Sequence, residues 1–333
     1  MPERLTHPIP TESRSRTGAH GRPGSLARKD QPDVCALHTP TRREVMIAYL
    51  LFRIADTFED SSSWPRESRI QALEQFCELL LQADAPADPG LTSKWAAEAR
   101  RLAAYWAAET PVSDDGYREL LEDTPHVLDD YAGLNPEARA LVCRHTVPTV
   151  RGMAGFVSET DDEGRLQLQS LADLRGYCYV VAGIVGEMLT ELFLLGRPSL
   201  AETGPFLRER SRAFGEGLQL VNILKDSATD IREGRAYIPA GVDRSEVFSV
   251  ARRDLETASE YTLALQGAGA EDGLVAFNAL PLRLAWATLD RVERDGPGAK
   301  ISREEVWEIV ADLSQSLESN RPAVVLPVSH AAR

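Results

Sequence analysis

The feature that most constrains the fold is the spacing of apolar residues. From Arg42 to about residue 318 they recur every three or four positions, and almost no stretch alternates between apolar and polar residues. This period places apolar side chains on one face of an α-helix, whereas alternation is typical of a strand. Helices are predicted at roughly 42–60, 66–82, 93–109, 115–122, 137–158, 171–195, 206–232, 245–267, 272–292 and 303–318, separated by Gly, Pro, Asp and Ser clusters. The expected fold class is all-α, in one domain without solenoid repeats.

The two ends of the chain differ in composition from this helical part. Residues 1–40 are rich in Arg, Ser, Pro, Thr and Gly and have little apolar periodicity, which predicts a disordered N-terminal segment. The helical domain is expected over 41–320. Residues 321–333 begin with a short apolar run bounded by Pro322 and Pro327, and they are interpreted as a tail.

Charge and composition exclude several classes of function. Lys and Arg number 37 against 51 Asp and Glu, a formal net charge of -14, which disfavours nucleic acid as a partner. The four cysteines form no CxxC pair, and no signal peptide or apolar run of about 20 residues stands out, so a cytoplasmic protein is expected. The basic excess up to Arg43 leaves open a peripheral contact with anionic lipid, with a solvated tail as the alternative. No protein partner is indicated.

The stretch YLLFRIADTFED, residues 49–60, ends an apolar helix with carboxylates. Asp56 and Asp60 are four residues apart, so they lie on one helix face, with Glu59 beside them and Arg53 one turn earlier. Like charges so placed destabilise a helix. Either a cation compensates them, from the protein or as a bound metal, or the pair is simply a solvated acidic helix end.

A second polar face strengthens the metal interpretation. In GLQLVNILKDSATDIREGRAYIP, residues 217–239, one face carries Gln219, Asn222, Asp226 and Asp230. Such groups are unfavourable to bury on an apolar helix unless they bind something. Oxygen ligands without His or Cys suit Mg²⁺, which takes one or two carboxylates together with substrate phosphates, so the predicted ligand is a diphosphate. The cations near these aspartates, able to contact its other oxygens, are Arg53, Lys225, Arg232 and Arg235.

Five stretches, in this order, resemble the squalene/phytoene synthase family of head-to-head prenyl transferases. They are YLLFRIADTFED (49–60), RGMAGFV (151–157), YCYVVAGIVGEMLTELF (177–193), NILKDSATDIREGRAYIP (222–239) and FNALPLRLAWATL (277–289), within residues 42–310. The resemblance implies the isoprenoid synthase fold, a single helical domain around a central cavity. It also implies Mg²⁺ on two opposite walls, held by Asp56, Glu59 and Asp60 on one and by Asp226 and Asp230 on the other.

The resemblance implies further roles. Tyr49, Arg53, Asn222 and Arg235 fall on positions that line the diphosphate and cofactor region, and Lys225 stands where many members carry Arg. Tyr177 matches a tyrosine near the reacting carbons. Phe277 and Pro281 match positions in the cavity wall.

The middle stretch also makes physical sense as a cavity wall. Tyr177, Val181, Ile184 and Met188 form an apolar stripe, and the small residues Ala182, Gly183 and Gly186 leave room for a prenyl tail or a neighbouring helix. The ring of Tyr177 can face a carbocation. The alternative is ordinary helix packing.

The reaction implied by the resemblance joins two prenyl diphosphates head to head. The stretches YCYVVAGIVG and FNALP are eukaryote-like, which favours a squalene-type enzyme that converts farnesyl diphosphate through presqualene diphosphate. Whether NADPH is a second cofactor stays open. Phytoene synthesis from geranylgeranyl diphosphate is the alternative. The segment PDVCALHTPTRREV, residues 32–45, lacks the family's Ser-Arg-Ser-Phe-like motif, which leaves open a one-substrate terpene cyclase or a non-catalytic prenyl diphosphate binder.

Overall fold

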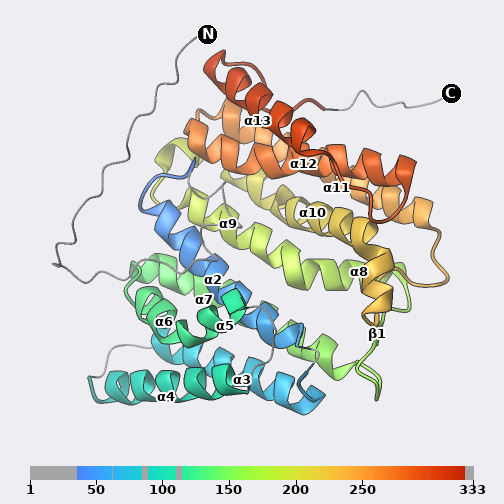
Figure 1. Ribbon diagram of the computed structural model, residues 1–333. Helices are drawn as coiled ribbons and strands as arrows, with labels where there is room; N and C mark the ends of the chain where they lie inside the picture. The colour runs from blue at the N-terminus through green and yellow to red at the C-terminus, as the bar shows by residue number, and fades with distance from the viewer. Residues whose placement is uncertain (1–35, 62, 85–88, 110–114, 327–333) are drawn as a thin grey trace, which may run out of the picture.

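A computed structural model describes residues 36–61, 63–84, 89–109 and 115–326. Residues 1–35 of the predicted disordered segment and residues 327–333 of the predicted tail lie outside these ranges. Helices dominate the described residues, so the all-α prediction is confirmed (Figure 1). The helices are α2 (Thr41–Glu59), α3 (Arg66–Asp84), α4 (Pro89–Ala108), α5 (Asp115–Glu122), α6 (Thr124–Ala132), α7 (Pro136–Ser158), α8 (Leu171–Cys178), the π-helical η2 (Tyr179–Gly183), α9 (Ile184–Leu194), the short 3-10 helix η3 (Pro198–Leu200), α10 (Gly204–Arg232), α11 (Arg244–Gly267), α12 (Asp272–Asp295) and α13 (Arg303–Glu318).

The helix boundaries follow local chemistry. Asn135 and Asp243 accept hydrogen bonds from the first turns of α7 and α11. At α13 the Ser302 side chain accepts from the Glu305 amide, and the Glu305 side chain accepts from the Ser302 amide. Such caps satisfy backbone N–H groups that the first turn of a helix leaves without partners.

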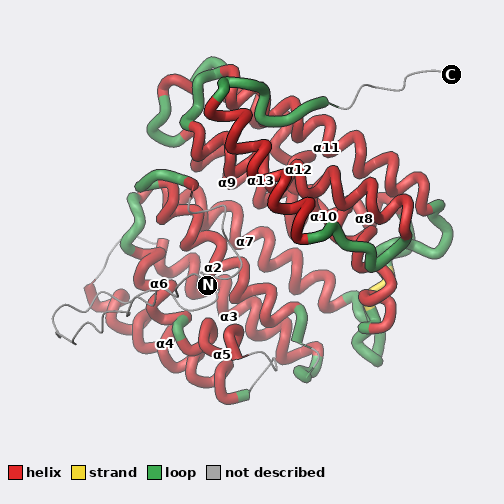
Figure 2. Tube along the Cα trace, turned by 45° about the horizontal axis from the view of Figure 1, so that its top comes forward, coloured by secondary structure: helices red, strands yellow, loops and turns green. Residues whose placement is uncertain are grey.

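Several short elements were not predicted. The nine-residue α6 has Pro125 near its start and is too short for its period to stand out. The two-residue strands β1 (Leu166–Gln167) and β2 (Arg235–Ala236) pair in parallel, with Leu166 opposite Arg235. Figure 2 places this small sheet near the end of α10, where β2 contacts that helix.

The helices form two packed groups. In one, α3 packs on α7 beside α2, and its buried residues include Phe58, Phe76 and Trp106. In the other, α10 packs on α11, and α12 contacts both α11 and α13. Helix α9 contacts α7 and α10 and therefore joins the groups, as Figure 1 shows.

The helical stretch that joins the groups, Leu171–Leu194, is long and apolar enough to cross a membrane by length and composition. The expectation that no such stretch exists is therefore wrong. Half of its most apolar window is buried inside the protein, and a core helix passes the same test, so this is weak support for a membrane span.

Close contact with α10 fixes the position of this stretch. A Cβ built on Gly186 would lie 2.1 Å from the carbonyl oxygen of Ser211, and one on Gly215 would lie 2.0 Å from the carbonyl oxygen of Ala182. Only glycine permits backbones to approach this closely. The approach sets η2 and α9 directly against the helix that carries the second aspartate pair.

The segment after α13 also packs on the domain. Ala323 and Val324 are buried, and the Arg283 Nε donates to the Ala323 carbonyl oxygen at 2.6 Å. The first residues of the predicted tail therefore belong to the packed structure.

Candidate active site

A pocket of about 270 Å³ lies between α2, the α8–η2 stretch, α10 and β2. It brings together both predicted carboxylate clusters and the predicted tyrosine, from positions up to 174 residues apart along the sequence. Its lining residues are Asp56, Glu59, Asp60, Tyr177, Val181, Gln219, Asn222, Ile223, Asp226, Asp230, Arg235 and Tyr237.

The end of α2 forms the first wall. Arg53 Nη1 donates to Asp56 Oδ2 at 3.0 Å, and its guanidinium also lies over the ring of Tyr117. Burial raises the pKa of Asp56 to about 6, against the opposing charge of Arg53. Burial, reinforced by the carboxylates of Asp60 and Asp56, raises the pKa of Glu59 to about 8. Without a cation, this wall therefore disfavours full ionisation of its carboxylates.

Helix α10 forms the opposite wall. Lys225 Nζ donates to Asn222 Oδ1 at 3.4 Å and lies 3.2 Å from Asp226 Oδ2. Burial raises the pKa of Asp230 to about 6, although the nearby Arg235 lowers it. This wall therefore combines amide and carboxylate oxygens with one adjacent ammonium group.

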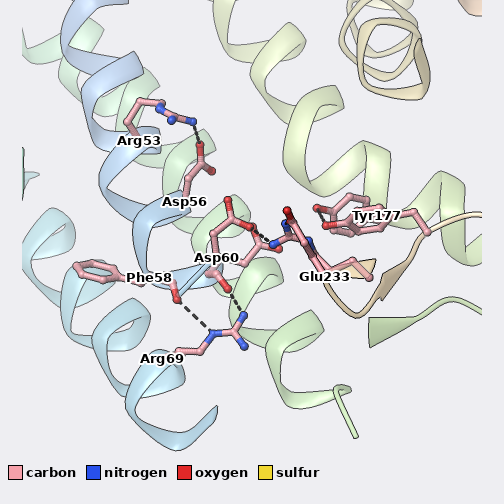
Figure 3. A network of polar contacts seen from close by, with 10 residues as sticks. Arg53, Asp56, Phe58, Asp60, Arg69, Tyr177 and Glu233 are labelled. Atoms are coloured by element: carbon pink, nitrogen blue, oxygen red, sulfur yellow. Dashed lines mark hydrogen bonds and ion pairs between the residues drawn. The ribbon is translucent and has the colours of Figure 1, made fainter. Parts of the chain in front are cut away.

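Arg235 links the end of α2 to the end of α10 through Asp60 and Glu233, which are both labelled in Figure 3. Its Nη1 donates to Asp60 Oδ1 at 2.8 Å, and its Nη2 donates to Glu233 Oε2 at 2.5 Å. The pairing of β2 with β1 fixes the backbone here. The Nε atoms of Arg235 and Arg53 are buried and find no hydrogen-bond acceptor within the described ranges. Two buried donors without acceptors, one on α2 and one on β2, fit a site for an anion.

Two tyrosines lie side by side in the pocket. Tyr177 Oη donates to Tyr237 Oη at 3.1 Å, and the ring centroids are 4.6 Å apart. Phe156 meets the Tyr177 ring edge-on at a centroid distance of 5.1 Å. Burial raises the pKa of both tyrosines, so both hydroxyls stay protonated near neutral pH.

Some predicted residues lie beside the pocket or away from it. Arg53 and Lys225 do not line it but pair with its aspartates. Tyr49 and Pro281 are half-buried, and Phe277 packs edge-on against Phe193 at 5.8 Å. These three are outside the pocket lining, and their role in a longer cavity stays a prediction.

The apolar stripe predicted on residues 177–193 lies partly in the pocket wall and partly in ordinary helix packing. Val181 lines the pocket, whereas Ile184 and Met188 are buried and Met188 belongs to the core around α7. The exposed Arg232 donates to the Thr229 hydroxyl and does not line the pocket.

Tyr237 and Arg69 are among the residues of the site that were not predicted from the sequence. Tyr237 stands two positions after Arg235, just past the end of β2, and this strand is too short for a period in the sequence to mark Tyr237. Arg69 of α3 donates to the carbonyl oxygens of Phe58 and Glu59 at the end of α2. No motif marks Arg69, because its place depends on how α3 packs.

The donor set can be compared with the needs of a metal ion. Within the described part of the chain, no three His, Cys, Asp or Glu side chains are grouped so that they could hold a metal by themselves. The pocket offers carboxylates on two walls instead. This suits an ion that binds one or two carboxylates and completes its coordination with substrate phosphates and water, as Mg²⁺ does.

Comparisons with known proteins agree with this geometry. The family model described as squalene/phytoene synthase matches residues 34–306. The squalene synthase of Eremothecium gossypii is 28% identical over 251 residues, covering 74% of this chain and 50% of the relative. That of Yarrowia lipolytica is 31% identical over 206 residues, covering 61% and 40%. The chain thus spans about half, or less, of the length of these relatives.

A solved structure supports the fold. TcSQS in complex with the ligand E5700 superposes with a TM-score of 0.63 at 23% sequence identity, covering 86% of this chain and 84% of that one. A second TcSQS structure, with BPH1237, gives a TM-score of 0.61 at 22% identity. The expected isoprenoid synthase fold is confirmed.

Proposed function

Because the chain belongs to the squalene/phytoene synthase family, we propose that it joins two prenyl diphosphates head to head, converting farnesyl diphosphate through presqualene diphosphate as a squalene synthase does. The observation that carries this proposal is the meeting of two carboxylate walls, from α2 and α10, in one pocket with Tyr177. The relatives named squalene synthase favour this product over phytoene.

The metal in this proposal is Mg²⁺. Asp56, Glu59 and Asp60 would hold it on one wall, and Asp226 and Asp230 on the other. When bound, it neutralises the diphosphate and stabilises the charge that develops on the leaving group. Carboxylates whose pKa values are raised by burial and by each other gain from a nearby cation, which supports the assignment.

The chain's own cations bind and orient the diphosphate oxygens. The free Nε donors belong to Arg53 on α2 and to Arg235 on β2, and the ammonium of Lys225 lies beside Asp226. Donors fixed in place before the reaction stabilise developing charge without reorganisation. They act most strongly in a site from which water is excluded.

The aromatic side of the pocket would receive the reacting carbons. Tyr177 is only 4% exposed and packs against Phe156 and Tyr237, so this side excludes water that would quench a carbocation. The electron-rich face of an aromatic ring attracts a cation. The protonated hydroxyl of Tyr177 is held by Tyr237.

The experiment that tests the proposal incubates the protein with farnesyl or geranylgeranyl diphosphate and Mg²⁺, with and without NADPH, and identifies products by mass. A C30 hydrocarbon that requires NADPH supports the squalene-type reaction. A C40 product without NADPH would shift the assignment to phytoene synthesis. A C15 alcohol or cyclic C15 hydrocarbon as the sole product would overturn head-to-head condensation in favour of a one-substrate cyclase.

The location of the enzyme in the cell is also a proposal. We propose a cytoplasmic enzyme whose basic residues up to Arg43 contact anionic lipid, since its substrates and products are partly or wholly apolar. Co-sedimentation with vesicles that contain or lack anionic lipid tests the contact.

A further inference from the structure

Arg69 lies at the end of the acidic helix although it belongs to another element. It sits in the first turn of α3, and its Nε donates to the Phe58 carbonyl oxygen at 3.3 Å while its Nη2 donates to that of Glu59. Figure 3 shows its guanidinium directed at the last turn of α2. Both acceptors are backbone atoms next to proposed metal ligands.

The end of α2 needs such a donor for two reasons. The last carbonyl groups of a helix have no partner within the helix, and their dipoles place partial negative charge there. The same turn carries Asp56 and Glu59, and α2 has no basic residue in its last turn. Negative charge from backbone and side chains therefore accumulates at one point.

The planar guanidinium of Arg69 both donates to the unpaired carbonyl groups and balances part of the negative charge. Its fork binds two carbonyl oxygens, and its charge interacts with Glu59 and Asp60. Asp60 in turn accepts from Arg235 on the opposite side of the pocket. The chain of contacts therefore runs from α3 through the last turn of α2 to β2.

We propose that Arg69 is a positioning residue for the metal–diphosphate site: by holding the carbonyls of Phe58 and Glu59, it sets the direction of the carboxylates of Glu59 and Asp60. This inference rests on the proposed function, because it concerns the same site. Arg69 contacts no residue on the α10 wall in this network, so its effect reaches the ligand through α2.

The chain contains a matched control one turn earlier on α3. Arg66 Nη1 donates to the Thr160 carbonyl oxygen at 2.8 Å, after the end of α7. Both arginines are half-buried and both bind a backbone carbonyl outside their own helix. Only Arg69 binds the acidic turn, so a loss shared by both variants reports on packing alone.

The experiment measures binding of inorganic pyrophosphate with Mg²⁺ by calorimetry, with no turnover involved, for the unmodified full chain and the variants Arg69→Gln, Arg69→Lys and Arg66→Gln. Groups that hold metal ligands in place typically contribute about 10- to 100-fold to metal affinity. For Arg69→Gln we expect a loss of about tenfold, because the contacts are to backbone and not to the carboxylates themselves. Arg69→Lys keeps the charge without the fork, so its loss should be smaller.

The outcomes separate the inference from the function it rests on. Unchanged affinity in Arg69→Gln, or an equal loss in Arg66→Gln, overturns the positioning role while the proposed function stands. If Arg69→Gln does not fold, Arg69→Lys decides, since a folded variant with full affinity overturns the role. A protein that binds no pyrophosphate with Mg²⁺ even without substitution overturns the proposed function and this role together.

Discussion

Single side chains in the pocket are placed where their charges conflict. The pKa values of Asp56 and Asp230 are each raised to about 6, with burial as the largest cause. Burying a charged carboxylate is unfavourable unless a positive charge pairs with it. On each wall, the arginines of the protein balance only part of the negative charge. Arg53 binds Asp56, and Arg235 lies near Asp230. The remaining negative charge is what a metal–diphosphate ligand would balance.

The substitutions Asp56→Asn and Asp226→Asn remove one carboxylate from each wall. We expect each to lower kcat/KM for farnesyl diphosphate by about 10²-fold or more, because charge stabilisation of the leaving group is lost. Initial rates measure the effect, and circular dichroism checks the helical fold. Asp130→Asn is the control, because Asp130 is exposed and pairs with Arg43 at the surface. A near-normal rate in either pocket variant contradicts the metal assignment.

The two buried tyrosine hydroxyls depend on each other. Tyr237→Phe removes the acceptor of the Tyr177 hydroxyl, whose residue is 4% exposed, so a buried donor loses its partner. We expect the free energy of unfolding to fall by about 1–3 kcal/mol, measured by urea denaturation. Tyr105→Phe is the control, since Tyr105 is 51% exposed. Equal stability of the two variants would mean that the hydroxyl pair contributes nothing.

Among the elements, the crossing of α9 over α10 determines the geometry of the site. The backbones meet at Gly186 and Gly215, while η2 brings Val181 and the end of α8 brings Tyr177 to the pocket. A π-helical turn adds a residue to the helix and shifts the side chains that follow, and such turns are frequent at functional sites. The glycines and the π turn together explain why one helix presents both a packing face and a pocket wall.

A pair of glycine substitutions tests this crossing. The Cβ of Gly186→Ala would lie 2.1 Å from the Ser211 carbonyl oxygen, so the helices must separate, and we expect a loss of about 1–3 kcal/mol in unfolding free energy. The Cβ of Gly176→Ala, also in this stretch, meets nothing within 4 Å, and we expect a gain of about 0.5–1 kcal/mol. Chemical denaturation measures both. Similar changes in the two variants would refute the close contact.

The helices could be predicted because each has an apolar face with a clear period, and most ends agree with the structure to within two or three residues. Helix α6, the π turn and the two-residue strands could not, since each is too short to carry a period of its own. In the site, the four-residue spacing of the aspartates was visible in the sequence. The partnership of Tyr177 with Tyr237, and of Arg69 with the end of α2, arises only from packing.

At the scale of the whole molecule, the pocket lies where the two helix groups meet. Phe58, next to the acidic end of α2, belongs to the core of one group. Ile223, between Asn222 and the aspartates of α10, belongs to the core of the other. Each core is apolar and holds its helix rigidly, so carboxylates that repel one another are kept face to face. The folded state therefore contains repulsion between carboxylates, and both pH and bound ligands change its strength.

This conflict makes the stability of the metal-free protein depend on pH. The pKa of Glu59 rises from an ordinary 4.5 to about 8 in the folded protein, with burial as the largest cause. The folded state thus binds a proton that the unfolded chain releases, so the contribution to stability is complete below about 4.5 and is lost as the pH rises through about 8. We expect Tm in EDTA to fall between pH 6 and 8, and to fall less in Glu59→Gln, which has no such proton. Because Mg²⁺ with pyrophosphate competes with protons for these carboxylates, it should raise Tm most at the upper end of this range. The same slope in both proteins would show that Glu59 is not protonated in the folded state.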